Sequence, residues 1–254
     1  AADAPFNTVP ELVAAAKKLT RRDASQYGWV ANGQKGPAVA QDWMQYNKQL
    51  GGSILGLDGR PALNSDANVQ SLRLYKELFD QAAPPGAVEF DWGGREESFR
   101  QGLVANMQTW SVGASGYDDP AQSKVVGRNT VAVAPVAQGM KPTYGIGGWA
   151  LAINADVDDR QKAAAWEYIK WVTSPAIQKE MALQGGGGFL RRSTLADTEL
   201  NAKFRFLPVL AESFEHGDGN FRPRIPQYPE IQDLLGTAVN AVLTGGAEPK
   251  AALD

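Results

Sequence analysis

Residues 144–154, "YGIGGWALAIN", place three glycines and a tryptophan directly before a short apolar run. Glycine lets a backbone come close to another group, and the flat indole of Trp149 can stack on the apolar face of a sugar ring. The apolar run 150–153 predicts a buried strand. The stretch matches neither the P-loop pattern nor Gly-x-Gly-x-x-Gly, so it does not predict a nucleotide site. It predicts a strand that begins next to a ligand.

The segments on either side of this stretch alternate between helical and strand-like patterns, which indicates an α/β protein. One predicted helix starts at Ser65 or Asp66 and ends before Pro84. The other helices are predicted for residues 10–21, 39–50, 96–102, 160–173, 175–183, 199–214 and 229–243. Further strands are predicted for residues 27–30, 104–109 and 130–135. Four consecutive glycines at 185–188 predict a sharp change of direction.

Length and composition bound the function. A chain of 254 residues suits one large domain or two modest ones. A net charge of −3 argues against strong non-specific binding to nucleic acid or an anionic membrane. No apolar run reaches the roughly 18 residues of a membrane span. The first residues show neither a basic nor an apolar region, so we expect no signal peptide within this chain.

The residue types available for covalent or metal chemistry are few. There is no cysteine and a single histidine, His216, so a histidine zinc site or a serine–histidine triad would depend on that residue alone. We therefore expect neither a metal nor another cofactor. A glycosidase needs two facing carboxylates, but the local acidic pairs lie in segments typical of solvated loops or helix starts. A binding protein is the favoured interpretation, with a carbohydrate-active hydrolase as the alternative.

Aromatic and arginine side chains are the candidates for ligand contact. Trp43, Trp92, Trp110 and Trp149 lie in loops or at the ends of elements, beside polar or small residues. For any one of them core packing is an equally good explanation, but the four together favour a carbohydrate site. Arginines in the loops after residue 190 and before residue 226 suit hydroxyl pairs or a carboxylate, although each is equally well explained as an exposed surface charge.

Six segments, in the same order along the chain, resemble the extracytoplasmic solute-binding proteins of bacterial ABC importers, in their carbohydrate-binding, maltose-binding-protein-like group. "GGWALAIN" followed by "KAAAWEYIKWVTSPAIQKEMALQGGGGFLRRSTL" carries most of the resemblance. The others are "TVPELVAAAKKLT", "WMQYNKQLGGSIL", "NSDANVQSLRLYKELFD", "SFRQGLVANMQTW" and "RPRIPQYPEIQDLLGTAVNAVLTG".

The resemblance implies a periplasmic-binding-protein-like α/β fold with two lobes and a hinge. It implies that a sugar, oligosaccharide or polyol is bound between the lobes without covalent chemistry and delivered to a membrane permease, in the periplasm or another extracytoplasmic space. The arginines leave a sugar acid open as a ligand. The ligand-binding positions that it implies are Gln41, Asp42, Trp43, Trp110, Gly147, Gly148, Trp149, Arg191, Arg222 and Tyr228.

The resemblance also implies how the chain is divided. Residues 1–143 and 189–254 are expected in the second lobe, and 148–186 in an incomplete first lobe. A strand and two helices cannot bury their apolar faces alone. We therefore expect an exposed apolar surface around Leu151, Ile153, Trp166 and Ile169. A separate N-terminal chain or a second copy would cover it; the alternative is a binding-deficient fragment that acts through assembly.

Overall fold

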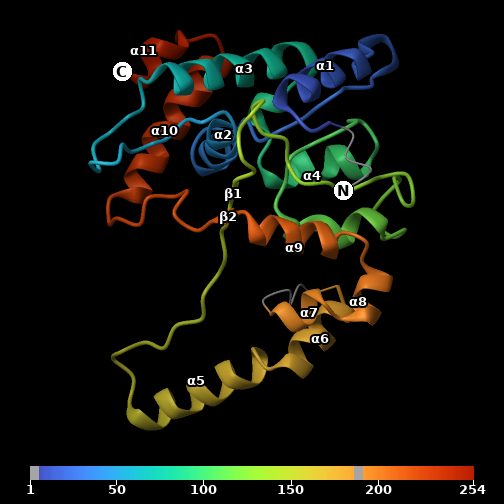
Figure 1. Cartoon of the computed structure of the whole chain (residues 1–254), viewed down its shortest axis with the longest axis vertical. Helices are drawn as coiled ribbons and strands as arrows, with labels where there is room; N and C mark the ends of the chain where they lie inside the picture. The colour runs from blue at the N-terminus through green and yellow to red at the C-terminus, as the bar shows by residue number, and fades with distance from the viewer. Residues whose placement is uncertain (1–5, 186–190) are drawn as a thin grey trace. The chain divides into compact units, whose positions relative to one another are not determined.

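The computed structural model describes residues 6–185 and 191–254 (Figure 1). The chain divides into two compact units. Unit 1 runs to Ile146 and resumes at His216, and unit 2 is Gly147–Glu215. Within the described ranges, no helix combines the length and apolar character that a membrane span requires.

Unit 1 is built from helices that begin where the sequence supplies caps. At the start of α1, Thr8 and Glu11 form a reciprocal capping box, and the Ser65 hydroxyl accepts a hydrogen bond from the Asn68 N–H at the start of α3. The helices are α1 (Val9–Leu19), α2 (Pro37–Gln49), α3 (Asp66–Ala82), α4 (Trp92–Arg100), α10 (Tyr228–Leu243) and α11 (Pro249–Leu253), with short 3₁₀ helices at Arg22–Ala24, Ala87–Glu89 and Ser111–Asp118.

Helix α2 lies at the centre of unit 1, where it packs against both α3 and α10. The approach of α10 to the start of α2 depends on glycine. A Cβ atom at Gly236 would lie only 2.2 Å from the carbonyl oxygen of Gly36, a distance that no side chain tolerates. This close contact holds the middle of α10 against the start of α2, and the candidate site is built on these two helices.

The core of unit 1 is an aromatic cluster around Trp29. The Trp29 ring packs edge-on against Tyr46, Tyr75 and Phe79, with centroid separations of 5.7, 5.7 and 5.2 Å. Each of these geometries is a favourable arrangement of aromatic rings. Because Tyr46 comes from α2 and the other two from α3, the cluster joins the two helices.

Strands are sparse. β1 (Tyr144–Gly145) and β2 (Gly217–Asp218) form a parallel pair, in which Tyr144 is the partner of Gly217. The predicted strands at 27–30 and 104–109 are reduced to the isolated bridges Tyr27↔Val104 and Val30↔Met107. The prediction of strands at 130–135 and 150–153 is wrong. Neither segment pairs with another strand within the described residues.

Unit 2 consists of α5 (Asp159–Val172), α6 (Pro175–Leu183), α7 (Arg192–Leu195), α8 (Thr198–Lys203) and α9 (Leu207–Glu215). Helix α6 contacts α5, α7 and α8, and α9 contacts α7. The helix predicted over 199–214 is split into α8 and α9, and the short helices α7 and α11 were not predicted. Three of the four consecutive glycines, 186–188, lie outside the described residues. Residues 191–215 belong to unit 2 in this division. The family resemblance instead predicts that 189–254 all belong to the second lobe, and the assignment of residues to lobes stays a prediction.

The expected exposed apolar surface is present in unit 2. Leu151 is 57% exposed and Trp166 53%, while Ile153 and Ile169 are half-buried. Tyr168 and Trp171 add to this surface, because each is more than half exposed. Helix α5 contains no buried residue.

Candidate functional site

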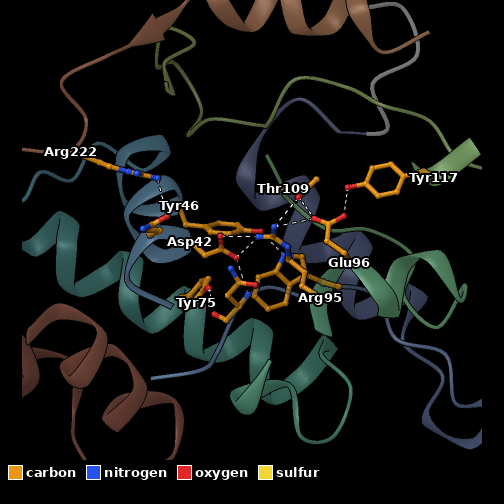
Figure 2. Close-up of polar contacts among 11 residues, drawn as sticks. Asp42, Tyr46, Tyr75, Arg95, Glu96, Thr109, Tyr117 and Arg222 are labelled. Carbon is orange, nitrogen blue, oxygen red and sulfur yellow. Dashed lines mark hydrogen bonds and ion pairs between the residues drawn. The ribbon is translucent and has the colours of Figure 1, made fainter. Parts of the chain in front are cut away.

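Gln41, the fifth residue of α2, connects two segments that are distant in the sequence. Its Oε1 accepts a hydrogen bond of 2.9 Å from Arg222 Nη2, as drawn in Figure 2. Its Nε2 donates to Gln232 Oε1 on α10 at 3.1 Å. The Gly236–Gly36 approach explains why this is feasible, because Gln232 lies one turn before Gly236 in α10. One side chain thus orients an arginine and an amide at the same face of unit 1.

The Arg222 guanidinium lies against two aromatic rings. Its central carbon is 5.0 Å from the ring centroid of Trp110 and 5.3 Å from that of Phe221, within the range of cation–π attraction. Burial lowers the pKa of Arg222. Tyr228, the first residue of α10, is also half-buried, and its hydroxyl lies 3.9 Å from Met44 Sδ. Arg222 therefore lies between Trp110 and Gln41, and Tyr228 contacts Met44 on the same helix as Gln41.

Gly145, at the end of β1, is hydrogen-bonded to Gln45 of α2, the same helix that carries Gln41. The Gln45 side chain accepts from the Gly145 N–H at 3.1 Å and donates to the Gly145 carbonyl at 3.3 Å. A Cβ atom at Gly145 would lie 2.5 Å from Gln45 Nε2 and 2.6 Å from the Phe221 ring, so a larger residue would have to displace both side chains. The glycines of this stretch were predicted to let the backbone come close to a ligand. At Gly145 the backbone does come close to other groups, but these are the side chains of Gln45 and Phe221.

A buried ionic network lies behind this face (Figure 2). Arg95 Nη1 donates to both carboxylate oxygens of Asp42, at 2.9 and 2.8 Å. Arg95 Nη2 donates to Glu96 Oε1 at 3.1 Å and to Thr109 Oγ1 at 2.8 Å. The hydroxyls of Thr109 and Tyr117 donate to Glu96. Because Thr109 directly precedes Trp110, the network holds in place the backbone that carries the stacking candidate.

Burial and charge set the protonation of this network. Burial alone would lower the pKa of Arg95, but the Asp42 and Glu96 carboxylates raise it above its ordinary value. Burial raises the pKa of Asp42 above its ordinary value. The charge of Arg95 and the hydrogen bond from the Asn32 N–H act in the opposite direction. Burial also raises the pKa of Tyr46, so its phenol stays neutral and accepts a 2.7 Å hydrogen bond from Trp29 Nε1. The network links α2, α4 and the segment before Trp110.

Two of the predicted site residues in unit 1 have buried side chains, and their part in ligand binding stays a prediction. Trp43 is 0% exposed and part of the hydrophobic core. Asp42 is buried, with its carboxylate held by Arg95. In α2 the side chains of Asp42 and Trp43 point towards the interior, whereas Gln41, one residue earlier, is only half-buried. The structure therefore supports a packing role for the Trp43 indole and a positioning role for the Asp42 carboxylate.

The predicted site residues in unit 2 are Gly147, Gly148, Trp149 and Arg191. Trp149 is fully exposed, and a Cβ atom at Gly148 would meet no neighbour within 4 Å. Arg191 Nε donates to the Thr173 carbonyl at 2.5 Å. The part of these residues in ligand binding stays a prediction.

Sequence reasoning missed Phe221, Gln232 and Arg95. Phe221 had a signal, since it adjoins Arg222 in the same proline-rich loop. A glutamine on an amphipathic helix and an arginine followed by two glutamates have the pattern of ordinary surface positions, so nothing local distinguished Gln232 and Arg95.

Residues 3–179 match the family described as bacterial extracellular solute-binding protein. The chain belongs to this family. The resemblance predicted from the six segments is thereby confirmed. The name of the family describes its members as binding proteins of the extracellular space.

Relatives and solved structures agree with this membership. An ABC transporter solute-binding protein from Agrobacterium radiobacter K84, crystallised with ribitol, is 64% identical with a TM-score of 0.94, over 100% of this chain. A probable amino-acid ABC transporter periplasmic-binding protein of Sinorhizobium fredii is 27% identical over 98% of this chain, and a mannitol-binding protein of Pseudomonas aeruginosa is 28% identical over 91%. The predicted periplasmic-binding-protein-like fold is confirmed.

The chain spans only part of the length of these relatives. It covers 64% of the Agrobacterium chain, 55% of the Sinorhizobium protein and 56% of the Pseudomonas protein.

Proposed function

We propose that this chain is part of the substrate-binding component of an ABC importer and binds a small sugar or polyol. The observation that carries the proposal is the grouping of Gln41, Trp110 and Arg222 on one face of unit 1. The ribitol and mannitol named for two relatives support a polyol over an oligosaccharide.

Each side chain of this face has a role in the proposal. Trp110 stacks on the C–H surface of the ligand, as aromatic rings do on sugars. The amides of Gln41 and Gln232 and the Arg222 guanidinium bond its hydroxyls, each acting as donor or acceptor according to its chemistry. Trp149 and Arg191 of unit 2 remain proposed contacts.

The proposed function involves no catalysis. The acids of the described network, Asp42 and Glu96, are both bonded to Arg95 and so lack the free, facing arrangement that glycoside hydrolysis requires. The proposed partners are the membrane permease and the small-molecule ligand, and the proposed location is periplasmic or extracytoplasmic. A second chain or copy over the exposed surface of unit 2 stays a prediction.

Titration calorimetry of the purified protein with ribitol and mannitol tests the proposal. We expect binding of at least one polyol, and Trp110→Ala should weaken it about tenfold or more, because about 1.4 kcal/mol of stacking corresponds to a factor of ten. Trp171→Ala, on the exposed surface of α5, is the matched control and should leave affinity unchanged. Equal effects of the two substitutions, or no binding of any polyol or sugar, would contradict the proposal.

A further inference from the structure

The Arg222 guanidinium carries a charge that no carboxylate in the described chain neutralises. Its partners there are neutral: the Gln41 amide and the faces of Trp110 and Phe221. The neighbouring acids of unit 1 are committed to other cations. Asp42 and Glu96 are held by Arg95, and Asp218 pairs with Lys48. A half-buried cation without a counterion is costly, since desolvation disfavours its charged form.

Most donors of this guanidinium also lack an acceptor within the described residues. Arginine has five N–H groups, and this one makes a single hydrogen bond there, from Nη2 to Gln41. Nε is buried and has no hydrogen-bond partner in the same part of the chain. Because Nε is buried and one N–H of Nη2 is taken by Gln41, the N–H groups left for the two oxygens of a carboxylate are those at the Nη1–Nη2 end of the guanidinium. The rings hold the group in position, but a cation–π contact supplies no second charge.

We infer that the site also takes a polyhydroxy acid, an aldonate-type sugar acid, whose carboxylate pairs with Arg222 while its hydroxyls meet Gln41 and Gln232. This inference rests on the proposed function and names a ligand class beyond it. A neutral polyol satisfies some of the free donors but leaves the charge of Arg222 unpaired. A carboxylate accepts hydrogen bonds from the free donors and also neutralises the charge of Arg222. Such a charge-assisted bond is stronger than a bond between neutral groups.

The matched probes are ribitol and ribonate, which differ by one terminal hydroxymethyl group replaced by a carboxylate. Calorimetry at low ionic strength should show ribonate binding about tenfold or more tightly than ribitol, the ratio expected when a charge-assisted bond replaces a neutral one. Added salt should weaken ribonate binding and leave ribitol binding nearly unchanged.

Two variants separate Arg222 from the general charge of the protein. Arg222→Gln should abolish the preference for ribonate, and it keeps an amide that can bond hydroxyls. Arg224→Gln removes the same charge two residues away, where the guanidinium donates to the Gly219 carbonyl, and should preserve the preference.

The outcomes are distinguishable. Ribitol binding with weaker or absent ribonate binding overturns this inference and leaves the proposed function standing. An equal loss of preference in both variants also overturns it, because the effect would then come from net charge. Absence of binding by either compound overturns this inference, and the titration with mannitol then decides whether the proposed function stands.

Discussion

At the scale of single residues, Arg95 does the most to organise unit 1. Its guanidinium joins Asp42 on α2, Glu96 on α4 and Thr109 in the segment before Trp110. Both partner carboxylates are largely buried, so each depends on this one cation for compensation. Loss of Arg95 would leave two uncompensated charges in the interior.

We predict that Arg95→Met destabilises the protein by about 3–5 kcal/mol, the usual cost of removing one partner from a buried ion pair. Urea unfolding followed by circular dichroism measures the change. Arg100→Met is the control, since Arg100 pairs with the more exposed Glu97, and a surface pair contributes about 1 kcal/mol or less. Similar losses in the two variants would show that Arg95 is not the support described here.

Asp218 provides a prediction about pH. The hydrogen bond from Lys48 lowers the pKa of Asp218. Because this carboxyl is more acidic folded than unfolded, its contribution to stability is present above the unfolded pKa of about 3.9 and is lost as pH falls through the folded value. NMR titration of the carboxyl carbon should give a pKa below about 3.9, and Lys48→Met should raise it. An unchanged pKa in that variant would assign the shift to another cause.

Local sequence predicted some residues of the candidate site and not others. Gln41, Trp110 and Arg222 were identified and do gather on one face. Trp43 and Asp42 follow Gln41 directly, and the residues of this segment alone do not show that the helix turns them inward. Their burial is decided by what packs on α2, which is information from distant segments.

At the scale of elements, most of the longer helices could be predicted, whereas the short helices α7 and α11 and the strands could not. Caps such as Thr8 and Ser65, and apolar residues at helical spacing, are local signals that mark α1 and α3 closely. A strand requires a partner, and an apolar run such as 150–153 says nothing about where that partner is. The surviving pair, β1 and β2, joins segments more than 70 residues apart, consistent with that limit.

The contact between α2 and α10 gives a prediction at this scale. Gly236→Ala should destabilise the protein by about 1–3 kcal/mol, because the added methyl group overlaps the Gly36 carbonyl and pushes the helices apart. Intrinsic helix propensity alone would favour alanine by about 1 kcal/mol, so the sign of the change is informative.

Thr237→Ala, at the exposed neighbouring position, is the control for that measurement and should change stability by no more than about 0.5 kcal/mol. Thermal unfolding of both variants checks the expectation. A Gly236→Ala protein as stable as the original would mean that the two helices are not in close contact.

At the scale of the whole molecule, the two units differ in how well their helices are buried. Helix α3 buries residues such as Leu72, Tyr75 and Leu78, whereas α5 has no buried residue. Local opening requires little free energy where few apolar contacts must be broken.

We therefore predict that backbone amides of α5 exchange with solvent at least about tenfold faster than those of α3. Hydrogen exchange followed by mass spectrometry measures both helices in one experiment. Equal protection would instead show that another chain or segment covers Trp166, Tyr168 and Trp171 in solution.

The pairing of β1 with β2 has a consequence for the order in which the molecule forms. Unit 2 is inserted between these adjacent strands, so unit 1 needs residues from both before and after the insertion. The hydrogen bond from Arg222 to Gln41 spans 181 residues, and contacts of such long sequence separation form late. On a translating ribosome, Gln41 emerges long before Arg222 and α10 are synthesised. The candidate site of unit 1 is therefore completed only after Arg222 and α10 have been synthesised, and under the proposed function a growing chain is unable to bind its ligand before then.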